Sequence, residues 1–363
     1  MDTVFLLGAG ASIGHSKPAG NHALPSIFEF FAKAKLLNLR GTDPRIKRIE
    51  QYAKRILGKS IWNKRSHINL EELLTLLAIE IQLRELPELL EIREAIVEIV
   101  QFVISELQRK ILTTTTTDYQ SFSRALEDSD TVVTFNWDTL LDACLEAENK
   151  NQFRLFHDKL SAYGEQIMRM SGIRFAGPYH VLPVHGGPGY YLKLHGSVNW
   201  YYCTNSQCRI HNRVFPLPLT DYVQYCGECN EQMSILLIPP VLNKEYRRYP
   251  LIRRLWTLAA DAMSHASSLV VWGYSLPPTD FQSNWLFTKA RSKHLRTITL
   301  INPAIVNQSH TKLNAGFVRR FYDIFRDILP KTSLTLYATY DDYQNGLNIF
   351  TKFGIHPKQI KNV

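Results

Sequence analysis

Residues 3–12 read TVFLLGAGAS, an apolar stretch that ends at Gly8-Ala9-Gly10 and continues into small residues. An unbroken run of Val, Phe and Leu is typical of a strand buried on both faces, and the small residues after the glycines can open a helix. The pattern predicts a β-strand, a tight glycine turn and a helix. Because this order recurs along the chain, residues 3–12 indicate the class of fold.

Four further apolar stretches end in a polar or glycine turn. They are TVVTFNWD (131–138), YYLKLHGS (190–197), SLVVWGYS (268–275) and TITLINP (297–303). Apolar strands that alternate with helical patterns indicate an α/β fold, with a Rossmann-like parallel sheet covered by helices on both faces. Ligands bind such sheets outside the carboxyl ends of the strands, so we expect the turn residues to share one site.

The length of 363 residues, with 45% apolar and 21% charged residues, suits one large domain with a smaller module. Between the first strand and residue 115, apolar residues recur at three- and four-residue spacing, and Pro87 divides the longest run into two helices. We therefore expect a Rossmann-like core, a helical insertion and a small cysteine module. Their expected bounds are 1–23, 116–202 and 235–363 for the core, 24–115 for the insertion, and 203–234 for the module.

The net charge of +9 is spread along the chain. Dispersed Lys and Arg suit a solvated surface, attraction for the pyrophosphate of a dinucleotide, or nucleic acid; we do not expect direct nucleic-acid binding. No apolar run reaches the 18 or so residues that a membrane span needs. The amino terminus MDTVFLLG is acidic where a secretory signal would be basic, so we expect a cytoplasmic protein without membrane association.

Four of the five cysteines cluster as Cys203-x4-Cys208 and Cys226-x2-Cys229. This spacing is typical of a tetrahedral zinc site, with reduced cysteines or an iron–sulfur cluster as alternatives. Four thiolates leave no open coordination position, so we expect a structural metal. The fifth, Cys144, falls in a predicted helix and is expected in the core.

The glycine turn at residues 8–10 has two interpretations. Glycines let a backbone approach a pyrophosphate, and the following helix directs its free N–H groups at the anion, but a purely structural turn has the same residues. The usual dinucleotide-binding pattern G-x-G-x-x-G would place a third glycine at position 13, but this chain has Ile13 there and its next glycine is Gly14. Nor does a strand ending in an acidic residue follow about 20 residues later, as an ordinary dehydrogenase requires.

Two other strand ends carry candidate catalytic groups. The Asn136 amide can orient a water or a ribose hydroxyl, and the Asp138 carboxylate can accept a hydroxyl hydrogen bond; the alternative is that either residue caps the next helix. His195 directly follows an apolar strand, where a general base is useful. His185 lies in a Pro/Gly-rich stretch where nothing obvious fixes its ring, so we favour His195.

Taken in order, the segments GAGAS, TFNWD, KLHGS, the four cysteines, GYSLPPTD and INP resemble the sirtuin superfamily, most closely its prokaryotic sirtuin-like branch. The resemblance covers residues 4 to about 304. It implies that NAD⁺ binds at the strand ends, that Asn136 and Asp138 lie by the nicotinamide ribose, and that His195 corresponds to the family's catalytic histidine. The residues that it implies for the phosphates and the adenosine ribose are Gly8, Ala9, Gly10, Ser12, Gly273, Ser275 and Asn302.

The chain departs from protein-deacylating sirtuins after GAGAS, where it reads GHSKPAGNHALP instead of a loop with a Phe–Arg pair. GYSLPPTD and INP are typical of sirtuin-like proteins that hydrolyse NAD⁺ in bacterial antiphage defence, although the cysteine quartet is common in deacylases. We therefore expect an NAD⁺ hydrolase that acts as a defence effector. The alternatives are an NAD-dependent lysine deacylase and a non-catalytic subunit that senses NAD⁺ or ADP-ribose.

The resemblance also implies restraint, because an enzyme that depletes NAD⁺ would harm its host. We expect a homo-oligomer or a gating partner, such as an ATPase or another defence protein. The helical segment 24–112 is the place for such contacts, or it is a simple covering layer for the sheet.

Overall fold

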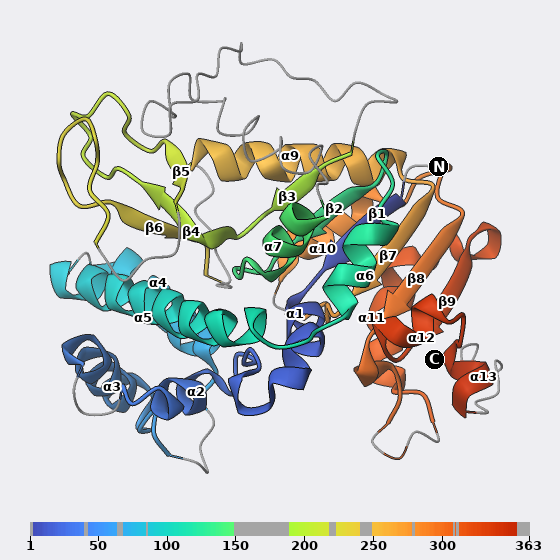
Figure 1. Cartoon of the computed structure of the whole chain (residues 1–363), viewed down its shortest axis with the longest axis horizontal. Helices are drawn as coiled ribbons and strands as arrows, with labels where there is room; N and C mark the ends of the chain where they lie inside the picture. Colours follow the sequence, from blue (N-terminus) through green and yellow to red (C-terminus); the bar gives the residue numbers. More distant parts are fainter. Residues whose placement is uncertain are drawn as a thin grey trace.

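The computed structural model describes residues 3–39, 43–63, 68–84, 86–148, 189–217, 223–239, 249–277, 280–307, 309 and 312–353. Six parallel strands form one sheet, which confirms the predicted α/β class (Figure 1). In spatial order they are β3 (Tyr191–Lys193), β2 (Thr131–Thr134), β1 (Thr3–Leu7), β7 (Ser268–Trp272), β8 (Thr297–Ile301) and β9 (Ser333–Tyr337).

The strand order reverses beside β1. The chain first adds β2 and β3 on one side of β1, and later adds β7, β8 and β9 on the other. This is the order of a Rossmann-type doubly wound sheet, in which the crevice at the reversal point, outside the carboxyl ends of the strands, binds the ligand. In this chain that point lies between β1 and β7, which pair in parallel from Thr3↔Ser268 to Leu7↔Trp272.

Two hydrophobic cores cover the faces of the sheet. Along β1, Val4 and Leu6 join one core and Leu7 joins the other, as the period of a strand requires. The first core includes side chains of α9 (Pro250–His265), α10 (Phe281–Lys289) and α11 (Ala315–Phe325). The second includes side chains of α1 (Ala9–Ser16), α6 (Asp118–Ala125), α7 (Leu140–Ala147) and α12 (Tyr340–Gln344).

The helical insertion extends the second core. Its helices are α2 (Phe30–Leu36), α3 (Pro44–Leu57), α4 (Leu70–Arg84) and α5 (Pro87–Leu112), and α5 begins at Pro87 as predicted. Proline suits that first helical position because its missing N–H would have no partner there. Helix α5 packs against α2, α3 and α4, and it also contacts two strands, β4 (Gly196–Tyr202) and β6 (Ser234–Leu237).

A small antiparallel sheet lies above α5 in Figure 1, with the strand order β5-β4-β6. Its strands are β4 (Gly196–Tyr202), β5 (Val214–Pro216) and β6 (Ser234–Leu237). Beyond it the four clustered cysteines share a separate small core with Tyr201, Phe215 and Met233. The module is therefore anchored through β4, which follows β3 directly.

The remaining described elements are short. They are η1 (Lys17–His22), η4 (Pro303–Ile305), η5 (Leu329–Lys331) and α13 (Ile349–Phe353). Among the described residues, no helix has the length and apolar character to cross a membrane.

Candidate functional site

Two backbone turns meet at the point where the strand order reverses. The Gly8 N–H, at the end of β1, donates to the Trp272 carbonyl at 2.9 Å, and the Gly10 N–H donates to the Gly273 carbonyl at 2.8 Å. The turn after β1 is thereby joined, main chain to main chain, to the turn after β7. This is the edge at which a doubly wound sheet receives a ligand.

The glycines at this contact have a steric reason. Gly273 has a φ of +68°, and a Cβ there would lie 2.0 Å from the Ala11 nitrogen. A Cβ on Gly10 would lie 2.7 Å from the Gly273 oxygen. Of the two interpretations of the glycine turn, close backbone packing is therefore present, and contact with a pyrophosphate stays a prediction.

Two of the buried polar side chains of α1, Ser12 and His15, contact Tyr119 of α6. The Ser12 and Tyr119 hydroxyls lie 2.7 Å apart. The His15 ring stacks on the Tyr119 ring with centroids 4.5 Å apart, and its Nδ1 accepts the Tyr119 N–H at 3.2 Å. Burial lowers the pKa of His15 to about 4, so the ring is neutral at physiological pH.

Ser12 is the centre of a buried hydrogen-bond network. Its Oγ accepts from Asn136 Nδ2 at 2.9 Å and lies 2.7 Å from the Tyr119 hydroxyl. The Ser12 hydroxyl also acts to lower the pKa of the nearby Asp138 carboxyl. The Ser12 side chain, 2% exposed, is therefore directed into this network; its expected contact with the pyrophosphate stays a prediction.

The Asn136 amide is held in one orientation. Its Nδ2 donates to the Gly8 carbonyl at 3.0 Å, and a carbonyl accepts only, so the amide nitrogen must face Gly8. Among the described residues, Asn136 Oδ1 has no hydrogen-bond partner although it is buried, and the same holds for Trp137 Nε1. An unpaired buried polar atom costs about 1–3 kcal/mol, so the Asn136 oxygen is a position where a ligand or water would find a hydrogen-bond acceptor.

Asp138 is buried at the start of α7. Its Oδ1 accepts the Leu140 N–H at 3.1 Å, so part of the helix-capping alternative is realised. Burial raises the pKa of the Asp138 carboxyl, and the Lys193 ammonium, the Ser12 hydroxyl and the Leu140 N–H act in the opposite direction. The protonation state of the Asp138 carboxyl therefore depends on these neighbouring groups.

His195 lies in the turn between β3 and β4, and it is 4% exposed. Its ring centroid is 5.0 Å from that of Phe135 and 6.2 Å from that of Trp256. His195 therefore packs against Phe135, the residue that directly precedes Asn136 in the chain.

The glycine that follows His195 lets β6 approach. Gly196 has a φ of +76°, and a Cβ there would lie 2.0 Å from the Leu236 oxygen. In addition, the Ile238 N–H donates to the His195 carbonyl at 2.8 Å. The backbone of the histidine is thus fixed by the strand that returns from the cysteine module.

The remaining predicted cofactor residues lie along the same edge. Ala9 and Ser275 are exposed, and the Ser275 carbonyl accepts from Arg320 Nε at 3.2 Å. Asn302 Oδ1 accepts the Ala304 N–H at 2.9 Å, while its Nδ2 donates to the Tyr274 carbonyl at 3.4 Å. Asn302 therefore joins the turns after β7 and β8, and the roles of these residues toward a cofactor stay predictions.

Several residues of the site escaped the sequence argument. Tyr119 looks like an ordinary core aromatic of an amphipathic helix, and Gln108 looks like a polar interruption of α5. In the structure Gln108 Nε2 donates to Thr139 Oγ1 at 3.0 Å and its Oε1 accepts the Thr139 N–H at 3.1 Å, which ties the insertion to the turn after β2. The one available signal was Lys193, a charge inside the apolar strand YYLKL.

Two other candidates need only brief comment. His185 lies outside the described residues. Cys144 is buried in α7, and burial raises the pKa of its thiol to about 11, which suits a core residue rather than a nucleophile.

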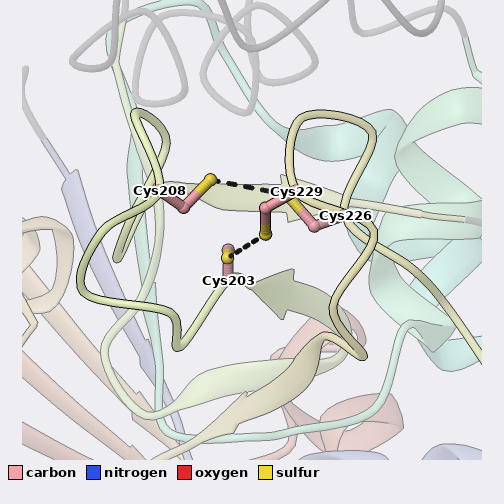
Figure 2. Close-up of side chains that lie close together, drawn as sticks. All are labelled: Cys203, Cys208, Cys226 and Cys229. Carbon is pink, nitrogen blue, oxygen red and sulfur yellow. Dashed lines mark hydrogen bonds between the residues drawn. The ribbon is translucent and has the colours of Figure 1, made fainter.

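Figure 2 shows the four clustered cysteines facing one another across two loops. The Cys203 and Cys229 sulfurs lie 3.6 Å apart, the Cys208 and Cys226 sulfurs 3.8 Å apart, and all four ligand atoms lie within 4.8 Å of one another. This arrangement can hold one metal ion, as the spacing predicted.

Comparisons with known proteins give a limited result. Neither a protein-family model nor a curated protein matches this chain. Among solved structures, a Sir2 homologue–NAD complex is similar with a TM-score of 0.43 and 13% identity, over 95% of this chain and 87% of the other. A triple mutant of a Sir2 homologue with 2′-O-acetyl ADP-ribose has a TM-score of 0.44 and 14% identity, over 97% and 92%.

Proposed function

We propose that this chain is an NAD⁺ hydrolase that cleaves the bond between nicotinamide and ribose, releasing nicotinamide and ADP-ribose. The observation that carries the proposal is the Asn136 amide, fixed by Gly8 and Ser12 with its buried oxygen unpartnered among the described residues. That oxygen can accept a hydrogen bond from a water or a ribose hydroxyl, and it lies beside the point where the strand order of the doubly wound sheet reverses. The resemblance of the strand-end motifs to sirtuin-like proteins names the dinucleotide.

Cleavage of the bond between nicotinamide and ribose needs little acid catalysis from the protein. Nicotinamide leaves NAD⁺ as a neutral molecule, so cleavage builds positive charge on the ribose C1′ and needs no strong acid. The protein must hold the ribose, stabilise an oxocarbenium-like transition state and present water. In this proposal Asn136 Oδ1 orients the water, the Asp138 carboxylate binds a ribose hydroxyl, and His195 accepts the proton that is released.

The turn residues would hold the rest of the dinucleotide. The main-chain N–H groups at the start of α1 suit a pyrophosphate, and Gly8, Ala9 and Gly10 present no side chain that would obstruct it. The turns that contain Gly273, Ser275 and Asn302 would line the adenosine side.

Zinc is the metal that we propose for the cysteine cluster. Four thiolates around Zn²⁺, at Zn–S distances of about 2.3 Å in tetrahedral geometry, lie about 3.8 Å from one another. The two sulfur pairs at 3.6 and 3.8 Å fit that requirement. With four protein ligands the ion has no open position, so it would stabilise the module and take no part in NAD⁺ cleavage.

The test is nicotinamide release from NAD⁺ by the purified chain, with and without an acetylated peptide. Release without peptide supports the proposal, and we expect His195→Ala to reduce it by about 10²–10⁴-fold, the usual contribution of a general base. The matched control is His294→Ala, because His294 is an exposed histidine away from these residues and should leave the rate unchanged.

The other outcomes separate the alternatives. Release that requires the peptide would make the chain a lysine deacylase, whose acyl oxygen replaces water as the nucleophile. Tight binding of ADP-ribose without any release would make it a nucleotide-sensing subunit. Near-normal release by His195→Ala would refute the assignment of the base.

A role in bacterial antiphage defence extends the proposal and rests on the motif resemblance alone. A hydrolase that empties the NAD⁺ pool must be restrained, so we propose a homo-oligomer or a gating partner such as an ATPase. The Gln108–Thr139 contact supports the insertion as the gating element, because it joins α5 directly to the turn that carries Asn136 and Asp138.

A further inference from the structure

A fully buried lysine lies beneath the proposed site. Lys193 is 1% exposed and sits on β3, the edge strand of the parallel sheet, in register with Thr134 of β2. Lysine is almost never buried completely unless its ammonium is paired, because removing the charge from water is costly. No role in the mechanism above has been given to this side chain.

The ammonium bridges two points of the segment that follows β2. Lys193 Nζ donates to the main-chain carbonyl of Asp138 at 2.5 Å and to Asp142 Oδ2 at 3.0 Å. The Tyr191 hydroxyl, from the same face of β3, donates to the same Asp142 oxygen at 2.8 Å. The end of the Asn136–Asp138 turn and the first turn of α7 are therefore both held from β3, the strand that leads into His195.

The charges around the Asp138 carboxyl come from four elements. Lys193 of β3 is the cation among the described groups that act on it, and Asp142 of α7 is a like charge. The Leu140 N–H of α7 donates to it at 3.1 Å, and the Ser12 hydroxyl of α1 acts to lower its pKa. Tyr119 of α6 lies near, and burial keeps the pKa of that phenol well above its usual range, so it stays neutral. Lys193 therefore lowers the pKa of the Asp138 carboxyl, and Asp142 raises it.

We propose that Lys193 is a positioning residue for NAD⁺ cleavage, which fixes the Asn136–Asp138 turn through the Asp138 carbonyl and keeps the Asp138 side chain anionic. The inference rests on the proposed function, because it assigns Asp138 the task of accepting a ribose hydroxyl as a carboxylate. It adds that β3, the strand that leads into His195, also sets the position and the charge of Asp138.

The test is the pKa of the Asp138 carboxyl itself, read from its ¹³C chemical shift as the pH is changed, with nicotinamide release by the same variants as the second readout. In Lys193→Met the nearby positive charge is lost, so the pKa of Asp138 should rise by about 1–3 pH units. In Asp142→Asn the like charge is lost, so the pKa of Asp138 should fall. Lys193→Arg keeps the charge and should restore the wild-type pKa.

The opposite signs separate this role from a structural one. If Lys193 only stabilised the fold, Lys193→Met and Asp142→Asn would lower activity and leave the pKa of Asp138 unchanged, which would overturn the proposal. Should Lys193→Met not fold, the downward shift in Asp142→Asn decides alone, and an unshifted Asp138 pKa refutes the proposal. A wild-type chain without nicotinamide release at any pH would instead overturn the proposed function, and the two failures are thereby distinguished.

Discussion

The four-cysteine module and the carboxyl edge of the parallel sheet are assembled in opposite ways. In the module, four thiols from 27 consecutive residues converge until all their sulfurs lie within 4.8 Å. At the sheet edge, the bonds from Ser12 to Tyr119 and to Asn136 join residues 107 and 124 positions apart. The first site depends on a short segment, whereas the second exists only when the whole sheet is formed.

This difference teaches where each region should be vulnerable. The module has its own small core and is attached through β4, so it should unfold independently of the parallel sheet. The sheet edge has no such independence, since the bonds of Ser12 to Tyr119 and Asn136 cross between elements. Substitutions there should change stability and NAD⁺ cleavage together. A matched control variant is therefore needed to separate the two effects.

Removal of the metal should have the largest effect and should be confined to the module. Zinc binding in small cysteine sites contributes on the order of 10 kcal/mol, so a chelator should unfold residues 203–234. We expect rapid proteolysis within that range while the parallel sheet keeps its amide protection in hydrogen exchange. Unchanged protease resistance after verified metal loss would show that the module does not depend on the ion.

Gly273→Ala tests the contact between the two turns. The new Cβ would lie 2.0 Å from the Ala11 nitrogen, so the turns must separate, and we expect a loss of several kcal/mol in the free energy of unfolding together with loss of ADP-ribose binding. Gly346→Ala is the control, because Gly346 has a similar φ of +66° with no atom within 4 Å of the added Cβ. The control should lose only about 1–2 kcal/mol. Equal losses in urea unfolding would refute the steric argument.

Acid should weaken the sheet edge through His15. The pKa of His15 is about 4 in the folded chain, lowered by burial from 6.5, so the unfolded chain binds the extra proton between these values. The stability is fully present above pH 6.5 and decreases as the pH falls toward 4, by up to about 3 kcal/mol. His15→Asn, which keeps an acceptor for the Tyr119 N–H, should flatten this slope in urea titrations across that window. A slope equal to that of the wild type would remove His15 as its source.

Ser12→Ala should have the smallest effect on stability and a distinct effect on activity. The change removes the centre of the network around Asn136 and Asp138, at a cost of about 1–3 kcal/mol, and should slow nicotinamide release. Ser16→Ala is the control, because Ser16 is a buried serine one turn further along α1 that accepts the Leu24 N–H at 3.0 Å. We expect similar unfolding free energies for the two variants, with normal turnover only in Ser16→Ala.

The same contrast explains what the sequence could predict. The four cysteines were identified because their spacing alone brings them together, and the parallel sheet was identified because apolar strands ending in turns alternate with helices. Pro87 marked the start of α5 because proline is tolerated only in the first turn of a helix. These are local rules that operate within a few residues.

The remainder depends on how elements are placed relative to one another. Nothing local distinguishes Tyr119 from the other aromatic residues of its helix, and only the packing of α6 against α1 brings its hydroxyl to Ser12. The rotation of α1 directs Ser12 into the network, a direction that the motif GAGAS does not encode. The role of Lys193 depends on the pairing of β3 with β2 and on the contact of its ammonium with Asp142, neither of which is local in the sequence.

The joined turns at Gly10 and Gly273 set the unit in which this site could be moved to another scaffold. The two segments are more than 260 residues apart, yet each occupies space that a side chain on the other would need. A graft of GAGAS alone would meet a foreign turn with a Cβ in its way. The transplantable piece is the pair of turns with the backbone bonds between them, and a designer who keeps β1 and β7 as neighbours inherits that pair intact.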